Sequence, residues 1–574
     1  MRSLRRKLVF DFAALVAGGL ALAAVAARGE DAIGQAQSVA AANGMVVAQE
    51  PLAAHIGIDV LRNGGNAVDA AVAIGFAMAV TYPRAGNIGG GGFMVIHRAG
   101  GEDVAIDYRE TAPAAINAKS FLDEQGEADP AKSRDSALGV GVPGTVAGLA
   151  LAEEKYGSGR FTLAELIAPA IKLARGGFAI AGDNAESLES DAARLGRWPA
   201  AAKIFLKPDG APLAAGDRLV QSDLADTLQA IADGGPAAFY LGPIAEKLAA
   251  AVQDSGGVMT AGDLKAYRAL ERVPVRGTYR GYDIVSTPLP SSGGIGLIEM
   301  LNILEGYDLA HTDPPQALYL TVEAMKRAYA DRAAFLGDPD RVTAPVARLI
   351  SKDYAALWRA TIDPAHATPA AEIRAGGTVA AEGRNTTHFS VADRFGNAVA
   401  NTYTLNFNYG LGLVAAGTGI LLNNELDDFA AKADAPNAYG LLGSEANAPG
   451  PGKRPLSSMT PTIVLKDGKP FLITGSPGGS RIITTVLQVV LDVIDRGMDI
   501  AAAVSAPRLH DQWLPDEVFA EPGVPADVIA TLTARGDRVV ATAPFAAADS
   551  IMIAPSGLVG AADPRTSGAL AAGY

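Results

Sequence analysis

A strand, a tight turn and a second strand between residues 386 and 404 constrain the fold of this chain more than any other feature. β-Branched and aromatic residues fill both arms, and the turn between them contains Gly396, a pattern typical of an antiparallel hairpin. If the turn is centred on Phe395, the two arms pair so that Thr404 lies opposite Thr386. Taken alone, this pair of hydroxyl groups is interpreted more simply as a cross-strand contact that stabilises a sheet.

Length and charge limit the classes of protein to consider. A chain of 574 residues is compatible with several domains or with one large layered α/β unit, and 49% hydrophobic residues provide for a sizeable core. The formal net charge of -14 argues against a nucleic-acid-binding protein, because phosphate neutralisation needs clustered Lys and Arg. With no cysteine, the chain has no disulfide, no thiolate metal site and no cysteine nucleophile.

Residues 1–26 have the composition of a bacterial secretory signal peptide. Basic residues at positions 2–7 precede an apolar run from Ala13 to Ala26, which ends in small residues. The alternative is a membrane anchor, but the run is shorter than the roughly 20 residues that a spanning helix needs. We therefore expect export to the periplasm, removal of the signal and no stable membrane span in the mature protein.

Apolar periodicity predicts several helices in the rest of the chain. They cover residues 67–82, 163–175, 222–232, 295–304, 318–335 and 481–494. Asn66 is the predicted N-cap of the first, which we interpret as a core helix because it is short for a membrane span and carries Asp69. Glu323, Lys326 and Arg327 are expected on the polar side of the helix over 318–335.

Candidate binding groups lie on both sides of the hairpin. The Gly89–Gly92 run precedes a strand, but no helix with Lys and Ser/Thr follows it, so a nucleotide site is not favoured. Arg109 ends a strand, and its forked guanidinium suits a carboxylate, although an Arg in such a place is by default a surface group. The carboxylates around Glu425 and Asp428 would suit an ammonium group as well as a metal, and no suitably spaced histidine accompanies them.

Two further loops have the character of active-site segments. Residues 436–455 form a long loop rich in Gly, Asn and Pro, with Tyr439 in it, of the kind that covers active sites. Gly478 and Gly479 come just before the helix predicted over 481–494, where free backbone N–H groups can hold an oxyanion. A purely structural turn is the alternative for this glycine pair.

Six motifs, in order along the chain, resemble those of the γ-glutamyltranspeptidases (glutathione hydrolases), a family of N-terminal-nucleophile hydrolases. They are Gly89–Gly92, Asp107-Tyr108-Arg109-Glu110, Pro290-Ser291-Ser292-Gly293-Gly294, Thr386-Thr387-His388, Arg454-Pro455-Leu456-Ser457-Ser458-Met459 and Gly478-Gly479-Ser480. The likeness covers nearly the whole mature chain. It implies an α+β fold, a four-layer αββα sandwich formed by two subunits that one precursor yields by self-cleavage.

The resemblance places the cut between Asn385 and Thr386, with residues 27–385 as the large subunit and 386–574 as the small one. Cleavage would free the α-amine of Thr386, whose pKa of about 7.7–8.0 suits a base that activates its own hydroxyl. By resemblance, Thr404 orients Thr386, and the Gly478 and Gly479 amides hold the oxyanion. Neither a metal nor a cofactor is implied.

By the same resemblance, Arg109, Ser457 and Ser458 bind the α-carboxylate of a γ-glutamyl group. Asn406, Glu425 and Asp428 would bind its α-ammonium, and Tyr439 matches the gating aromatic of the lid that some members have. The expected substrates are glutathione and other γ-glutamyl compounds, with water, amino acids or peptides as acceptors. The alternatives are a glutaryl or cephalosporin-type amidase of the same fold and, from another class, an inactive periplasmic amino-acid-binding protein.

Overall fold

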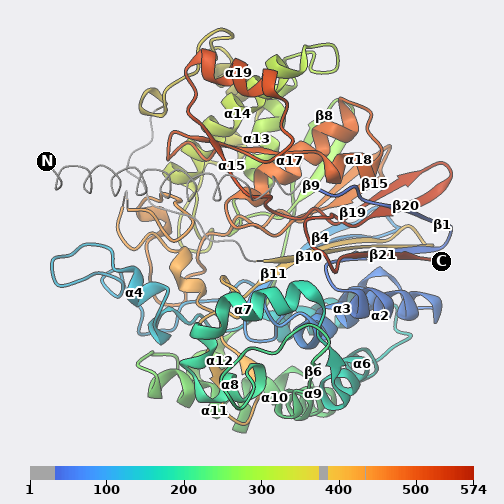
Figure 1. Ribbon diagram of the computed structural model, residues 1–574, viewed down its shortest axis with the longest axis vertical. Helices are drawn as coiled ribbons and strands as arrows, with labels where there is room; N and C mark the ends of the chain where they lie inside the picture. Colours follow the sequence, from blue (N-terminus) through green and yellow to red (C-terminus); the bar gives the residue numbers. More distant parts are fainter. Residues whose placement is uncertain (1–32, 374–385, 434) are drawn as a thin grey trace, which may run out of the picture.

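The computed structural model describes residues 33–373, 386–433 and 435–574, in which two seven-stranded antiparallel sheets pack face to face between two layers of helices (Figure 1). The first sheet has the order β21 (Leu570–Gly573), β2 (Gly44–Ala48), β10 (Thr387–Asp393), β11 (Ala398–Thr404), β3 (Gly91–His97), β4 (Asp103–Asp107) and β7 (Leu270–Arg272). The second has the order β1 (Ser38–Ala41), β20 (Gly557–Ala561), β19 (Ser550–Ala554), β15 (Lys469–Thr474), β14 (Thr462–Lys466), β9 (Tyr282–Ser286) and β8 (Val275–Tyr279). The predicted αββα sandwich is confirmed.

Side chains of the central strands alternate between two cores, as the period of two in a strand requires. In β2, Val46 and Ala48 pack against helices, whereas Met45 and Val47 pack between the two sheets. Every residue of β2, β3, β10 and β11 is buried, because both faces of the first sheet are covered. The strand that directly follows the predicted nucleophile therefore lies in the middle of the molecule.

Different helices cover the outer faces of the two sheets (Figure 1). The first sheet is covered by α2 (Pro51–Arg62), α3 (Ala67–Thr81), α5 (Thr145–Tyr156) and α6 (Leu163–Gly176). The second is covered by α13 (Gly293–Leu304), α14 (Pro314–Phe335), α17 (Arg481–Ile494) and α18 (Ile500–Ser505). These bounds confirm the predicted helices of both layers to within a few residues.

Smaller elements complete the described chain. α9 (Ser222–Gly234) packs against α6, and on the same side of the first sheet lie α7 (Gly182–Gly196), α8 (Pro199–Phe205), α10 (Pro236–Tyr240), α11 (Pro243–Asp254) and α12 (Ala261–Ala266) (Figure 1). The other helices are α4 (Pro130–Ser133), α15 (Val346–Leu349), α16 (Lys352–Arg359) and α19 (Ala526–Arg535), and the minor strands are β5 (Phe178–Ala179), β6 (Arg218–Leu219), β12 (Val414–Ala415), β13 (Ile420–Leu421), β16 (Leu509–His510), β17 (Val518–Ala520) and β18 (Val539–Ala541). The predicted signal and Asn385 lie outside the described residues.

The helix α3 begins at the capping box that the sequence indicates. The Asn66 side chain accepts hydrogen bonds from the N–H groups of Val68 and Asp69, and Asp69 accepts one in return from the Asn66 N–H at 2.8 Å. All residues of α3 are buried between the first sheet and α6, which confirms a core helix. No helix of the described residues has the length and apolarity needed to cross a membrane.

The polar side of α14 is buried. Lys326 forms an ion pair with Asp537 at 2.6 Å, and Arg327 forms one with Glu323 at 2.7 Å. All of these side chains are less than 5% exposed. The sequence pattern identified the polar face of the helix correctly but could not show that this face packs against a partner of opposite charge from the C-terminal part of the chain.

Candidate active site

The hairpin of β10 and β11 brings the two predicted threonines together. The strands pair in the register Thr387 with Tyr403 to Ala392 with Ala398, and continuing this register by one residue places Thr386 opposite Thr404. At the other end the Asp393 carboxylate closes the turn by accepting hydrogen bonds from backbone N–H groups. Thr386 itself is 8% exposed and lies just before β10, at the edge of a cavity.

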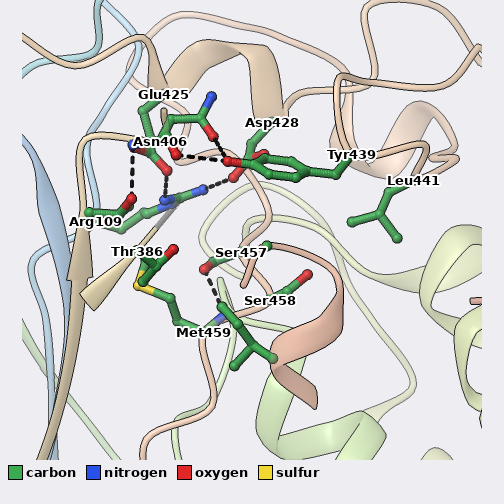
Figure 2. A pocket seen from close by; sticks show the side chains of 13 residues that line it. Arg109, Thr386, Asn406, Glu425, Asp428, Tyr439, Leu441, Ser457, Ser458 and Met459 are labelled. Atoms are coloured by element: carbon green, nitrogen blue, oxygen red, sulfur yellow. Dashed lines mark hydrogen bonds and ion pairs between the residues drawn. The ribbon is translucent and has the colours of Figure 1, made fainter. Parts of the chain in front are cut away.

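That cavity, which we name the acyl pocket, has an empty volume of about 280 Å³ (Figure 2). Its lining residues are Arg109, Thr386, Thr404, Asn406, Glu425, Asp428, Tyr439, Leu441, Ser457, Ser458, Met459, Gly479 and Ile482. Apart from Gly478 and the undescribed Asn385, every predicted site residue lines it. The sequence did not indicate that Leu441, Met459 or Ile482 would line the site, because apolar side chains carry no distinguishing chemistry.

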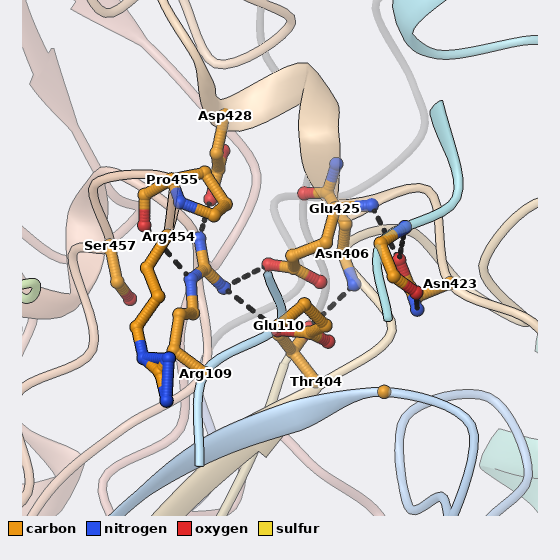
Figure 3. A network of polar contacts seen from close by, with 12 residues as sticks. Arg109, Glu110, Thr404, Asn406, Asn423, Glu425, Asp428, Arg454, Pro455 and Ser457 are labelled. Atoms are coloured by element: carbon orange, nitrogen blue, oxygen red, sulfur yellow. Dashed lines mark hydrogen bonds and ion pairs between the residues drawn. The ribbon is translucent and has the colours of Figure 1, made fainter. Parts of the chain in front are cut away.

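Arg109 is the charged centre of the acyl pocket (Figure 3). It follows β4 and is completely buried, contrary to the usual surface position of an Arg at a strand end. Its Nε donates to the Pro455 carbonyl at 3.1 Å, while its two Nη atoms form ion pairs with Glu425 and, at 2.5 Å, with Asp428. Burial disfavours the charged guanidinium, but these carboxylates outweigh burial and raise the pKa of Arg109.

Carboxylates outnumber cations around Arg109. Glu110 is also completely buried, and its nearest carboxylate oxygen lies 3.8 Å from an Arg109 nitrogen. Apart from its own backbone N–H, neither oxygen of Glu110 has a hydrogen-bond partner among the described residues. Burial raises the pKa of Glu110 to about 8 and also raises the pKa values of Glu425 and Asp428, although Arg109 opposes the shift in each case.

Replacing Glu110 with Gln should flatten the pH dependence of stability between about pH 5 and 8. In the unfolded chain a Glu loses its proton near pH 4.5, whereas folded Glu110 keeps it up to about pH 8. Its contribution to stability is therefore fully present below pH 4.5 and is lost as the pH rises to about 8. Urea unfolding midpoints at pH 5 and pH 8 measure the effect. The exposed Glu124→Gln variant is the control, and equal pH slopes for Glu110→Gln and the unaltered protein would contradict this account.

The loop that precedes α13 holds the segment with Ser457 and Ser458, which also lines the acyl pocket. The Ser457 N–H donates to the Pro290 carbonyl, and the Ser457 carbonyl accepts from both the N–H and the hydroxyl of Ser292, at 2.8 and 2.7 Å. Arg332 of α14 in turn donates to the Ser292 hydroxyl. The Ser458 hydroxyl is buried without a hydrogen-bond partner among the described residues, so it is available to a ligand.

Tyr439 closes the top of the acyl pocket (Figure 2). Its hydroxyl donates to the backbone carbonyl of Asn406 at 2.8 Å and also contacts the Asn406 side-chain oxygen. Its ring stacks on Phe407 with centroids 5.7 Å apart. Asn406 has a φ of +76° and donates from its side-chain nitrogen to the Asn424 carbonyl, so its amide is engaged with the protein in this state.

Gly478 and Gly479 lie at the N-terminus of α17, as predicted. Both have positive φ, +131° and +57°, which favours glycine at each position. A Cβ on Gly478 would also lie 2.9 Å from the Cβ of Ala546. Neither N–H donates a hydrogen bond to another described residue, and the helix terminus favours negative charge, so the pair can accept an oxyanion.

A four-layer αββα sandwich with a threonine just before a central strand, beside a charged pocket and a glycine pair at a helix N-terminus, is the architecture of the N-terminal-nucleophile hydrolases. Within that class, the chain belongs to the gamma-glutamyltranspeptidase family, whose family model matches residues 53–573.

Curated relatives and a solved structure agree with this assignment. The chain is 50% identical to the glutathione hydrolase proenzyme of Escherichia coli (strain K12) and 46% identical to that of Pseudomonas sp. (strain A14). These alignments cover 93% of this chain, with 93% and 95% of the respective relatives. A crystal structure of cephalosporin acylase from Bacillus halodurans superposes with a TM-score of 0.84 at 27% identity, covering 95% of this chain and 98% of the acylase.

Proposed function

We propose that this protein is the precursor of a γ-glutamyltransferase and glutathione hydrolase that cuts itself between Asn385 and Thr386. The observation that carries the proposal is the acyl pocket, where Thr386 lies beside one buried guanidinium and several buried carboxylates. A γ-glutamyl group presents a carboxylate and an ammonium on one carbon, which is the charge pair that this lining complements. The names of the two curated relatives support the same activity.

Self-cleavage begins with the Thr386 hydroxyl attacking the Asn385 carbonyl carbon. The C–N bond breaks as the acyl group moves to oxygen, and the amide nitrogen takes up the proton that the hydroxyl loses. Water then opens the ester, leaving a carboxylate on Asn385 and a free α-amine and hydroxyl on Thr386. Residues 27–385 and 386–574 become the two subunits, after removal of residues 1–26 on export to the periplasm.

The mature enzyme repeats the acyl transfer on substrate. The α-amine of Thr386 accepts the hydroxyl proton while the oxygen attacks the γ-carbonyl carbon, and the proton passes to the departing amine. Thr404, opposite Thr386 in the sheet, orients the nucleophile. The N–H groups of Gly478 and Gly479 stabilise the oxyanion, each by about 2.7–4 kcal/mol. Water or the amino group of an amino acid or peptide then releases the γ-glutamyl group.

Substrate binding exchanges partners around Arg109. Before binding, Arg109 is paired with Glu425 and Asp428. The substrate carboxylate would take a share of the guanidinium together with the Ser457 and Ser458 hydroxyls, while its ammonium would neutralise the two released carboxylates and contact Asn406. Because Glu425 and Asp428 share one guanidinium, a substrate that brings its own ammonium group gives both carboxylates a cationic partner. Tyr439 covers the bound group and limits access of water.

The first rival is an amidase like the cephalosporin acylase that shares the fold. A glutaryl substrate has no ammonium, so it would leave the pocket carboxylates unpaired. We expect kcat/KM for γ-glutamyl-p-nitroanilide to exceed that for glutaryl-p-nitroanilide by about 100-fold or more, because buried polar groups without partners discriminate strongly. Release of p-nitroaniline at 410 nm is the measurement. Asp428→Asn should reduce the ratio of the two kcat/KM values. A higher kcat/KM of the unaltered enzyme for the glutaryl anilide would contradict the proposal.

The second rival is an uncut periplasmic amino-acid-binding protein. Intact mass of the purified protein separates it from the enzyme, because the mass reports removal of the signal and internal cleavage together. Two subunit masses that sum to the mature chain plus one water support the proposal. A single full-length mature chain that binds glutamate without turnover supports the rival.

A further inference from the structure

The Asp107 side chain lies behind Arg109, outside the lining of the acyl pocket. Asp107 ends β4, is 1% exposed, and accepts a hydrogen bond on Oδ1 from the Arg109 N–H at 3.0 Å. A carboxylate that accepts from the N–H two residues further along the chain fixes the backbone turn between them. Asp107 therefore determines how the chain leaves β4 and where the Arg109 side chain begins.

The other oxygen of Asp107 binds the segment that leads to Ser457. Oδ2 accepts from the Nε of Arg454 at 3.1 Å, and the two side chains are 1% and 6% exposed. The residue after Arg454 contacts Arg109 in turn, because the Pro455 carbonyl accepts from Arg109 Nε at 3.1 Å (Figure 3). Asp107, Arg109, Pro455 and Arg454 thus close a circle of contacts, which we name the hydrogen-bond ring, between segments 346 positions apart.

Neighbouring groups hold the hydrogen-bond ring in one arrangement. The Tyr267 hydroxyl donates to the Arg109 carbonyl at 2.8 Å, so side chains bind both polar groups of the Arg109 backbone. Arg454 donates from Nη2 to the Arg268 carbonyl at 2.7 Å and from its N–H to Asp338 at 2.8 Å. Buried polar groups that are hydrogen-bonded on every side have little freedom to move, so the ring is a rigid support.

The charge of Asp107 is balanced by ion pairs within the protein. Arg272 of β7 also donates from Nε to Asp107 Oδ2, at 2.7 Å, and its two Nη atoms bind the Asp340 carboxylate at 3.1 and 2.6 Å. Asp107 and Asp340 thus share two guanidiniums, those of Arg272 and Arg454. The hydrogen-bond ring therefore needs no ligand for its own stability, and it influences the acyl pocket through the positions of its members.

The hydrogen-bond ring joins the two segments that carry the carboxylate-binding groups of the proposed function. Arg109 belongs to one segment, and Ser457 comes two residues after Pro455 in the other. A carboxylate is held tightly only where the guanidinium and the hydroxyl groups reach it together, so the spacing of these segments decides its affinity. We propose that Asp107 and Arg454 are positioning residues that set this spacing and thereby select γ-glutamyl donors with a free α-carboxylate. This inference rests on the proposed γ-glutamyl transfer.

The test compares two donors, γ-glutamyl-p-nitroanilide and its analogue with a carboxamide in place of the α-carboxylate. In Asp107→Asn, an NH₂ group replaces one oxygen and faces the guanidinium donors, so the ring opens at Arg454. KM for γ-glutamyl-p-nitroanilide should rise about tenfold while kcat changes less than about threefold, because the α-carboxylate is remote from the reacting carbonyl. The carboxamide donor should be affected less, so the ratio of the two kcat/KM values should fall about tenfold.

Arg454→Gln opens the same ring from its other side and should give the same change in KM and in the ratio. The double variant Asp107→Asn/Arg454→Gln should raise KM no further than the more affected single variant, because the ring is already open. Independent damage to the fold would instead make the two effects on KM multiply. A denaturing gel should show that each variant still cuts itself, and Arg454→Gln decides the test if Asp107→Asn does not fold.

Arg272→Gln is the matched control, because it removes an ion pair with the same Asp107 oxygen and leaves the hydrogen-bond ring closed. It should lower the urea unfolding midpoint and leave the ratio of the two kcat/KM values unchanged. An unchanged ratio in Asp107→Asn and Arg454→Gln would overturn the positioning role while the proposed function stands. An equal fall of the ratio in Arg272→Gln would overturn it too, because this indicates general destabilisation. Failure of the unaltered processed enzyme to release p-nitroaniline from γ-glutamyl-p-nitroanilide would instead overturn the proposed function.

Discussion

Replacing Thr386 with Ala should leave the mature protein as one chain and lower its γ-glutamyl hydrolase activity by at least about 10⁴-fold. Without the hydroxyl, neither the Asn385 carbonyl nor the substrate is attacked, and no new α-amine forms to act as the base. A denaturing gel, intact mass and p-nitroaniline release measure the two losses together. The methyl group of Ala fits where the Thr side chain packs, so the sheet should fold.

Thr386→Ser is the matched variant, because it keeps the hydroxyl and removes only a methyl group. It should still yield two subunits, more slowly, and retain measurable turnover. The mechanism would be contradicted by a Thr386→Ala protein that still cuts itself. An uncut Thr386→Ala or Thr386→Ser protein that turns over substrate at the rate of the processed enzyme would also contradict the mechanism.

Replacing Arg109 with Met should lower the free energy of unfolding by about 3–5 kcal/mol, because it leaves buried carboxylates without their cation. Glu425 and Asp428 both lose an ion pair, and Glu110 loses its nearest positive charge. The loss of unfolding free energy should be larger at pH 8 than at pH 5. At pH 5 these carboxyl groups, whose pKa values are raised, are more nearly neutral and need the cation less. Urea unfolding at the two pH values measures it.

Arg109→Lys separates charge from geometry in the same position. It should recover part of the stability, since an ammonium still neutralises one carboxylate, but little of the activity, because a point charge cannot bind two carboxylates and the substrate as a fork does. A Met variant within about 1 kcal/mol of the unaltered protein at pH 8 would contradict the assigned role of the ion pairs. Full activity in the Arg109→Lys variant would contradict the claim that activity depends on the forked geometry of the Arg109 guanidinium.

Local chemistry explains which parts of the fold the sequence predicted. The Asn66 and Asp69 side chains determine the start of α3 within a few residues of chain, and the turn near Phe395 determines the register of β10 and β11. Both depend on neighbours in sequence. The residues of α17 were likewise predicted from their period and from the glycines before them. Such elements need no knowledge of the rest of the fold.

Contacts between distant segments explain what the sequence could not predict. Arg109 and Glu425 are 316 positions apart, and only the assembled sheets bring them within bonding distance. The motifs indicated that both residues belong to the site, but not that they form an ion pair with each other. Glu110 appeared only as the last residue of a motif, because what distinguishes it, a buried carboxylate without a hydrogen bond from another described residue, is a property of its surroundings.

The order of strands has a consequence for the mature enzyme. In the first sheet, β10 and β11 lie between β2 and β3, and in the second, β20, β19, β15 and β14 lie between β1 and β9. The proposed break before Thr386 would therefore give two polypeptides whose strands alternate in both sheets. In the part of the chain that the structure describes, β10, β11, β14, β20 and β21 of one piece each pair with a strand of the other. The two pieces could therefore separate only by breaking these inter-strand hydrogen bonds, so a cut at this point leaves both sheets continuous.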